Sequence, residues 1–253
     1  MEVYEQQPLE GGFNSNYFIL DTNNTISLRR VPVSNIDLLE NIIFEFRYIG
    51  FTGDGGRIGR RSLEEQVDFS VKAQKAGLKV LPARINDDNM IMPFINDLRT
   101  MDVFLQDKET DELSKVIAIF KVIEDMKRAH NLGFVYGDRW SGNIAILHSG
   151  DPLHLDFDIE LSGPFAREVD MAQLLYHILW ADKEEVTQSF IKGLLFSGLN
   201  DYDFSKLTKY LKGFASFFEK THVGDMEESL GRLLDSVFVA RSTKNIGAII
   251  LSK

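Results

Sequence analysis

The stretch FVYGDRWSGNIAILHSGDPLHLDFDIE, residues 134–160, carries most of the information about the fold. Asp138 and Asn143 lie in a short polar turn between apolar runs, and Asp156 and Asp158 interrupt the apolar run LHLDFDIEL. Burying a carboxylate without a partner is costly, so three carboxylates and an amide at the ends of half-buried strands need a compensating charge. A bound cation would supply that charge.

The spacing of these residues indicates a particular chemistry. Asp138 and Asn143 fit the pattern D-x-x-x-x-N of the kinase catalytic loop, and the DFD at 156–158 follows a predicted strand, where kinases carry a metal-binding Asp. Phosphoryl transfer needs a carboxylate that orients the acceptor hydroxyl and takes its proton. It also needs hard oxygen ligands that hold Mg²⁺ on the phosphates. The stretch therefore predicts a site for Mg²⁺ and a nucleotide.

Composition limits the class of protein. The chain has 253 residues, 44% of them hydrophobic, which is enough for a large core. Its formal net charge of -10 disfavours general binding to nucleic acids or anionic membranes. There are no cysteines, the N-terminus has no apolar signal region, and no apolar run is long enough to span a membrane. We expect a cytoplasmic protein that binds neither membrane nor nucleic acid directly.

The first hundred residues predict mainly strands. FNSNYFIL and ISLRRV flank the turn DTNNT, and LKVLPARI and NMIMPFI flank the turn NDDN. NIDLLENIIFEFRYI has a mixed period that fits a helix or a strand, and GFTGDGGRIGRR, 50–61, predicts a flexible glycine-rich loop. Between these, SLEEQVDFSVKAQKAG predicts a helix with a capping box of Ser62 and Glu65.

The rest of the chain predicts mainly helices. One long helix runs from 111 to near Gly133, with an apolar stripe at helical spacing formed by Leu113, Val116, Ile117, Phe120, Ile123 and Met126. Two short strands, IAILH and PLHLDF, follow the polar turn, and amphipathic helices follow from about 167. The predicted fold class is α+β with two lobes, a β-rich lobe with one helix over 1–97 and a mainly helical lobe over 98–253. The cleft between the lobes is the expected ligand site.

Two segments carry a resemblance to a known family. YGDRWSGN and LDFDIELSGPFAREVDMA resemble the aminoglycoside phosphotransferase branch of the protein-kinase-like superfamily, which includes fructosamine, choline and homoserine kinases. EGGFNSNYFI with ISLRR is similar to the first hairpin of that branch, and 64–97 is similar to its helix, strand and hinge. Together these matches cover residues 10 to 180 and imply a bilobal kinase fold.

The resemblance implies roles for individual residues. Asp138 would be the catalytic base, and Asn143 and Asp156 would be the Mg²⁺ ligands. Asp170 would anchor the catalytic turn, and Asp158 would cap a turn or bind a second metal. The implied nucleotide-binding residues are Gly11, Gly12, Asn16, Arg29, Glu65, Met92, Pro93, Phe94 and Ile95.

The chain departs from the family pattern at two places. Tyr136 stands where a His usually opens the catalytic triplet. No Lys precedes Lys72, so Arg29, or Arg30 beside it, must replace the usual strand lysine. The residue of the following predicted helix that pairs with this arginine would be Glu65. Its sequence neighbours Glu64 and Gln66 are the alternatives. Arg139 could be a solvated charge or contact the acceptor phosphate, and Trp140 could stack on a substrate or pack.

The predicted function is transfer of the γ-phosphate of ATP, with Mg²⁺, to a hydroxyl of a small molecule. An acidic pocket wall would favour a cationic acceptor. Two alternatives stay open. The first is an atypical protein kinase or a kinase-like ATPase that works with a protein partner, as in the tRNA threonylcarbamoyl-modification machinery. The second, motivated by the missing lysine, is a pseudokinase that binds nucleotide without catalysis.

Overall fold

The computed structural model describes residues 14–20, 26–32, 36–96, 98–221 and 226–251. Its strands are β1 Asn14–Leu20, β2 Ile26–Pro32, β3 Arg57–Arg60, β4 Arg84–Asn86, β5 Asn89–Pro93, β6 Arg99–Thr100, β7 Ile144–Ile146, β8 Pro152–His154 and β9 Ile159–Ser162. Its α-helices are α1 Ile36–Tyr48, α2 Leu63–Lys75, α3 Met101–Gln106, α4 Glu112–Asn131, α5 Ala166–Ala181, α6 Glu185–Gly193, α7 Phe204–Lys220 and α8 Glu227–Leu251. Short helical turns are η1 Thr52–Asp54, η2 Ser141–Asn143 and η3 Leu194–Gly198.

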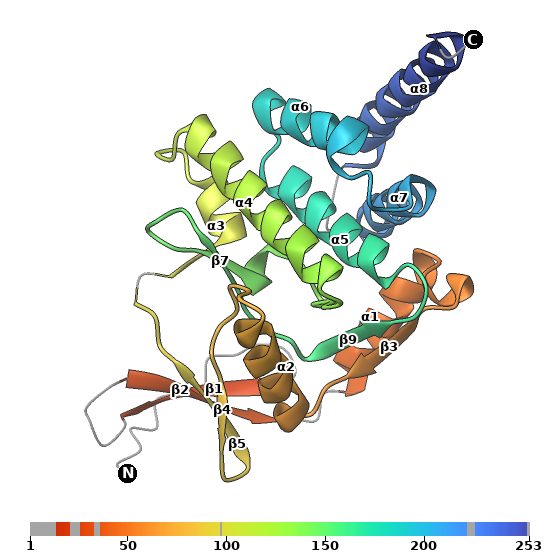
Figure 1. The fold of residues 1–253 in the computed structure, drawn as a ribbon. Helices are drawn as coiled ribbons and strands as arrows, with labels where there is room; N and C mark the ends of the chain where they lie inside the picture. The colour runs from red at the N-terminus through yellow and green to blue at the C-terminus, as the bar shows by residue number, and fades with distance from the viewer. Residues whose placement is uncertain (1–13, 21–25, 33–35, 97, 222–225, 252–253) are drawn as a thin grey trace.

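The N-terminal strands form an antiparallel sheet in the order β1-β2-β5-β4, with α2 packed against it (Figure 1). A small apolar cluster of Leu63, Met90 and Met92 joins this helix to the sheet. The predicted capping box is present: the Ser62 hydroxyl accepts from Glu65 N at 3.2 Å, and the Glu65 carboxylate accepts from Ser62 N at 2.7 Å. Two orphan amides at the start of α2 are thereby satisfied.

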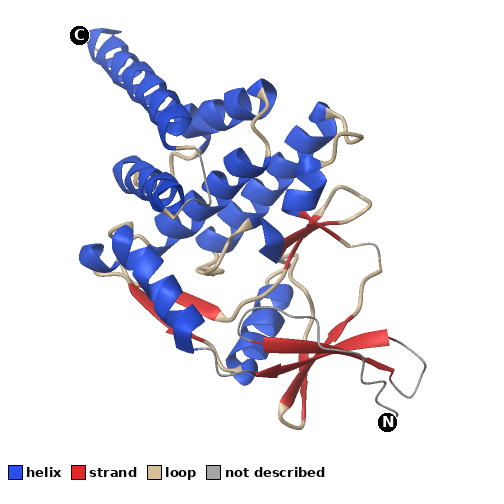
Figure 2. Ribbon diagram, turned by 180° about the vertical axis from the view of Figure 1, so that it is seen from behind, coloured by secondary structure: helices blue, strands red, loops and turns tan. Residues whose placement is uncertain are grey.

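The C-terminal half is a helical body around α4 and α5, and the view from behind shows most helices in the upper half and the longest strands in the lower half, with helices beside them (Figure 2). The chain therefore has the predicted α+β arrangement, an antiparallel sheet followed by a mostly helical part. Most side chains of α5 are buried, and α4 begins at the N-cap Asp111, as the sequence predicts.

The predicted apolar stripe of α4 is only partly buried. Ile123 and Met126 lie in the core, whereas Leu113, Ile117 and Phe120 are exposed. The buried face instead includes Ala118 and Ala129, together with Ile119 and Val122. The packed face of α4 is therefore rotated away from the predicted stripe.

Residues 36–60 lie beside the C-terminal helices, although they precede α2 in sequence (Figure 1). The strand β3 pairs antiparallel with β9, and α1 contacts α7. The segment thus packs with elements of the part assigned to 98–253, and the lobe boundary at 97 stays a prediction.

The glycine-rich segment 50–61 is ordered by burial, and the prediction of a flexible loop there is wrong. Phe51 is fully buried against Phe46 and Tyr210. A Cβ at Gly56 would collide with the Phe51 ring, which explains the need for glycine. Asp54 accepts hydrogen bonds from Lys209 and Tyr210, each at 2.7 Å.

Within the described residues, no helix is long and apolar enough to cross a membrane.

Candidate active site

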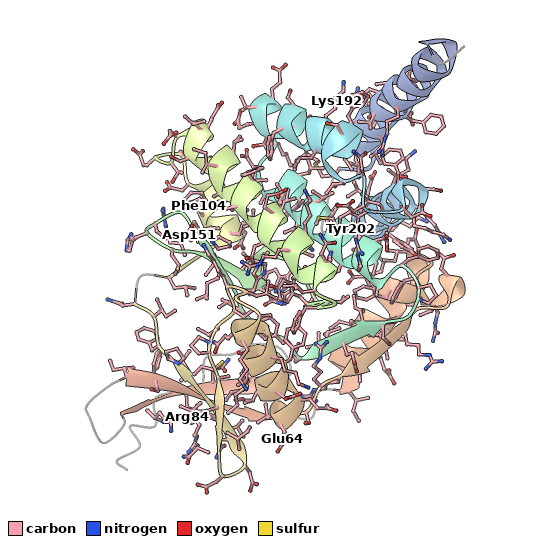
Figure 3. All side chains as sticks on the ribbon, in the orientation of Figure 1. Glu64, Arg84, Phe104, Asp151, Lys192 and Tyr202 are labelled. Carbon is pink, nitrogen blue, oxygen red and sulfur yellow. The ribbon has the colours of Figure 1, made fainter. Side chains whose placement is uncertain are left out.

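The polar turn after α4 is held in place by Asp170 on α5. The buried Asp170 carboxylate accepts hydrogen bonds from the backbone amides of Tyr136 at 2.9 Å and Gly137 at 3.1 Å. Its Oδ2 also lies 3.0 Å from Nε2 of His130, whose Nδ1 lies 2.7 Å from the hydroxyl of Tyr202, labelled in Figure 3. The position of Asp170 is the anchoring position that the family resemblance implies.

The backbone at Gly137 requires glycine. Its φ of 101° lies in the left-handed region, and a Cβ there would collide with the carbonyl oxygen of Ile159. This close approach brings the turn against the start of β9. It also fixes the direction in which the chain enters Asp138.

Two amides position the half-buried Asp138 carboxylate. Gln173 on α5 donates from Nε2 to Asp138 Oδ1 at 3.0 Å. Asn143 donates from Nδ2 to the Asp138 carbonyl at 2.9 Å and lies 3.5 Å from Oδ2. With these donors turned toward Asp138, the amide oxygen of Asn143 is the atom available to a cation.

The sequence analysis did not identify Gln173. It lies one helical turn after Asp170, so a helix placed over these residues would put both on one face. Its Oε1 accepts from Arg139 N at 2.7 Å while its Nε2 holds Asp138. One side chain therefore fixes both the backbone and the carboxylate of the turn.

Arg139 is fully buried, which excludes its interpretation as a solvated charge. Its guanidinium donates to the carbonyl oxygens of Asn143 at 3.3 Å and Leu155 at 3.1 Å, and also to that of Asp156. It lies over the rings of Tyr136 and Phe157. Arg139 thus ties the polar turn to the DFD segment.

Tyr136, in the place of the usual histidine, is buried and stacks on His154 with ring centroids 4.4 Å apart. Burial raises the pKa of the Tyr136 hydroxyl, so the ring is neutral at ordinary pH. The Tyr136 ring thereby packs the turn against β8.

Asp156 forms an ion pair with Arg30 on β2. Arg30 Nη1 lies 2.8 Å from Asp156 Oδ1, and Arg30 Nη2 lies 3.4 Å from Oδ2. Asp156 itself has a φ of 50°, an uncommon conformation for a residue other than glycine. Such positions concentrate at functional sites.

Of the alternatives that the sequence leaves open for the arginine and its helix partner, the structure brings together Arg30 and Gln66, each one position after the residue named first. Arg30, not Arg29, faces Asp156, and it donates to Gln66 Oε1 at 3.2 Å. Arg29 lies over the Tyr17 ring, because successive side chains of a strand point to opposite faces. Glu65 is used in the helix cap.

The remaining predicted nucleotide residues fall in three places. Gly11 and Gly12 lie outside the described residues. Asn16 lines the site and accepts from Arg30 Nε at 3.1 Å. The segment Met92 to Ile95 ends β5: Met92 is buried, Pro93 is exposed and lacks an N–H, and Phe94 packs on Phe18 with centroids 5.0 Å apart. Adenine binding by this segment stays a prediction.

The carboxylates repel one another. Burial, and then the charge of Asp156, raise the pKa of Asp158 to about 7. Burial raises the pKa of Asp138 to about 6, with Arg139 lowering it and Asp156 raising it further. Asn14 donates to Asp158 Oδ2 at 3.4 Å, a weak contact for a buried carboxylate. A set of oxygen atoms in this state suits a hard divalent cation.

In the described part of the chain, no group of three His, Cys, Asp or Glu side chains is arranged to hold a metal ion by itself. The assignment of Asn143 and Asp156 as Mg²⁺ ligands stays a prediction.

Asp138, Asn143, Asp156 and Asp158 line one cavity of about 600 Å³. Its other walls come from α1, α3, α5 and α7. Volumes of this order are typical of small-molecule sites. A cavity of about 640 Å³ lies behind the turn, between α2 and the start of α5, and Asp138 does not line it.

Comparison with known proteins supports the fold. No protein-family model and no curated protein matches the sequence. Among solved structures, the Rio2 kinase from Chaetomium thermophilum aligns with a TM-score of 0.51 at 13% identity, over 86% of this chain and 74% of that one. The ADP/Mg²⁺-phosphoaspartate complex of that kinase aligns with a TM-score of 0.49 at 12% identity, over 96% and 72%. The chain therefore has a protein-kinase-like fold, and its assignment to the aminoglycoside phosphotransferase branch stays a prediction.

Proposed function

We propose that the protein transfers the γ-phosphate of ATP to a hydroxyl group of a small molecule, with Mg²⁺ as cofactor. The main support for this proposal is that Asp138, Asn143 and Asp156 line one cavity of a protein with a kinase-like fold. Two of these residues come from the catalytic turn and one from the segment after β8. Residues placed in this way are the ones that phosphoryl transfer uses.

Asp138 acts as the base in this proposal. Gln173 and Asn143 hold its carboxylate in one orientation, and a remaining lone pair of the carboxylate can accept the proton of the acceptor hydroxyl. The acceptor oxygen then bonds to the γ-phosphorus while the bond from phosphorus to the β–γ bridging oxygen breaks. The products are a phosphate ester and ADP, and the proton remains on Asp138 until it exchanges with water.

Asn143 and Asp156 would hold the Mg²⁺, which neutralises charge on the phosphates when bound. Arg30 lies beside Asp156 and takes the place of the missing strand lysine, since its guanidinium can bind phosphate oxygens through two donors. The pseudokinase alternative is motivated by the missing lysine. The positive charge of Arg30 at this position therefore argues against it.

The shape of the site supports a small acceptor. On the far side of Asp138 the cavity is walled by Leu38 and Ile42 of α1 and by Trp180 and Phe218 of α5 and α7. A cavity with walls on these sides suits a small molecule better than an extended peptide. Transfer of the phosphate to a protein is the alternative that the experiment must distinguish.

The test is to incubate the protein with Mg-ATP and a panel of small alcohols, and then to locate the transferred phosphate by mass spectrometry. We expect one small alcohol to gain a phosphoryl group, and the Asp138→Asn variant to lose this activity by about 10² to 10⁴-fold. Phosphate found on the protein or on added proteins would favour the protein-kinase alternative. Transfer by Asp138→Asn at the wild-type rate would contradict the proposed role of Asp138.

A further inference from the structure

Arg61 is a buried arginine that donates to backbone carbonyl oxygens. It lies between β3 and the N-cap of α2, and it is 8% exposed. Its Nη1 donates to the carbonyl oxygens of Phe157 at 2.9 Å and Ile159 at 2.6 Å. Its Nη2 lies 3.5 Å from the carbonyl oxygen of Val135, just before the polar turn. The guanidinium therefore binds the backbone on both sides of Asp158.

The backbone of Arg61 extends this connection to Asp156. Arg61 N donates to the Asp158 carbonyl oxygen at 2.7 Å, and the Arg61 carbonyl oxygen accepts from Gln66 Nε2 at 3.2 Å. Gln66 Oε1 in turn accepts from Arg30, which forms the ion pair with Asp156. Arg61 is thus linked both to the backbone that follows Asp156 and, through two side chains, to the Asp156 carboxylate.

The segment before α2 fixes the position of Arg61. The strand β3 pairs with β9, so that Arg60 lies opposite Ile159, and Asp54 forms ion pairs with two lysines of α7. The guanidinium of Arg61 lies over the ring of Phe69 on α2, 4.6 Å from its centroid. Arg61 is therefore held by the C-terminal helices as well as by α2, and it cannot move away from the DFD segment alone.

The DFD segment contains a conformation that must be held in place. Asp156 has a φ of 50°, and such backbone positions persist only where the surrounding structure fixes them. Arg139 donates to the carbonyl oxygen of Asp156 and to that of the preceding residue. Arg61 donates to that of Phe157, the following residue. Because charged donors form stronger hydrogen bonds than neutral ones, the two arginines hold this backbone from both sides.

We infer that Arg61 is a positioning residue, which fixes the backbone of the DFD segment so that the Asp156 carboxylate faces the cavity of Asp138. This inference rests on the proposed function, in which Asp156 holds Mg²⁺. Without Arg61 the segment can leave its strained conformation, and only a fraction of the molecules would present Asp156 to the cation. The apparent affinity for the cation falls in proportion to that fraction.

Arg61→Met tests the inference, because it removes the donors and keeps a long side chain. Hydrogen exchange without metal or nucleotide should be faster in residues 155–160 and unchanged in α5 and α7. With a non-hydrolysable ATP analogue bound, free Mn²⁺ is measured by electron paramagnetic resonance. We expect the affinity for Mn²⁺ to fall about tenfold, as it would if one molecule in ten kept the competent conformation, and the affinity for the metal-free analogue to change less than about twofold.

Arg57→Met is the matched control, because it removes the same charge from an exposed position of β3. It should change neither the exchange of residues 155–160 nor the affinity for Mn²⁺. Arg61→Lys keeps the charge and one donor group, so its affinity for Mn²⁺ should lie between those of Arg61→Met and wild type. This variant also carries the test if Arg61→Met does not unfold cooperatively.

The inference is overturned if folded Arg61→Met binds Mn²⁺ as tightly as wild type. It is also overturned if the affinities for Mn²⁺ and for the metal-free analogue fall equally, or if neither Arg61 variant folds, because Arg61 would then serve the fold alone. Binding of Mn²⁺ that depends on Arg61, without phosphate transfer from Mg-ATP to any alcohol, would refute the proposed function alone.

Discussion

Arg30 Nη1 lies 2.8 Å from Asp156 Oδ1, although 126 residues separate them in the sequence. This ion pair joins the N-terminal sheet to the segment after β8. It places the guanidinium of Arg30 on β2 beside Asp156, the predicted metal ligand. Both partners are mostly buried, with side-chain exposures of 9% and 26%. In the proposed function, this pair aligns the two halves of the nucleotide site.

Replacing Arg30 should weaken nucleotide binding. A hydrogen bond to a charged group contributes about 1.5 to 3 kcal/mol, so Arg30→Met should raise the Kd for Mg-ATP by roughly 10- to 100-fold in titration calorimetry. Arg29→Met is the control and should change the Kd little, since Arg29 lies against Tyr17. A larger loss from Arg29→Met than from Arg30→Met would restore the register expected from sequence.

Gln173 should influence chemistry more than binding. In Gln173→Met a side chain of similar size loses the hydrogen bonds to Asp138 Oδ1 and Arg139 N. We expect kcat to fall by about tenfold, the equivalent of one neutral hydrogen bond, with the KM for ATP unchanged. Steady-state kinetics would contradict this role if only KM changed.

Asp170 should be needed for stability. Asp170→Ala would leave two buried backbone amides and His130 without their acceptor. The expected loss in free energy of unfolding is on the order of 3 kcal/mol in urea denaturation. Asp235→Ala, which removes an exposed contact with Lys212 at 3.5 Å, should cost less than about 0.5 kcal/mol. Equal losses in the two variants would disprove the anchoring role.

The site carboxylates should make the metal-free protein less stable as pH rises. The folded pKa values of about 6 for Asp138 and about 7 for Asp158 lie above the ordinary value of 3.8, so the folded chain holds these protons more tightly than the unfolded chain. The resulting stabilisation is complete below about pH 4 and is lost as pH rises through 6 and 7. Unfolding free energies in EDTA, measured from pH 4.5 to 8, should therefore decline less in Asp138→Asn than in wild type. An identical decline in both would contradict the burial of this charge.

Local patterns in the sequence were sufficient for much of the fold. The strand pairs around 21–25 and NDDN, the cap of α2 and the span of α4 each depend on neighbouring residues, and the structure contains all of them. The meeting of Asp138 and Asn143 follows from the short turn itself. The α+β class follows from strands in one half and helical periodicity in the other.

The errors arise where distant contacts decide the outcome. Arg29 and Arg30 are adjacent, and only the packing of β2 against Asp156 determines which of them enters the site. Segment 50–61 looks mobile from its glycines, but Phe51 is buried against Tyr210, and β3 pairs with β9 about a hundred residues later. The contribution of α1 to the cavity could not be identified because the mixed period of this segment does not show which of its faces is turned inward.

The central claim is that Asn143 and Asp156 bind the divalent cation of a nucleotide beside Asp138. The most direct measurement is the anomalous X-ray scattering of crystals grown with Mn²⁺ and a non-hydrolysable ATP analogue. We predict a metal peak about 2.1 Å from the Asn143 amide oxygen and from an Asp156 carboxylate oxygen, with the terminal phosphate of the analogue directed toward Asp138. Nucleotide bound with its metal away from both side chains, or no nucleotide in this cavity at all, would contradict the account.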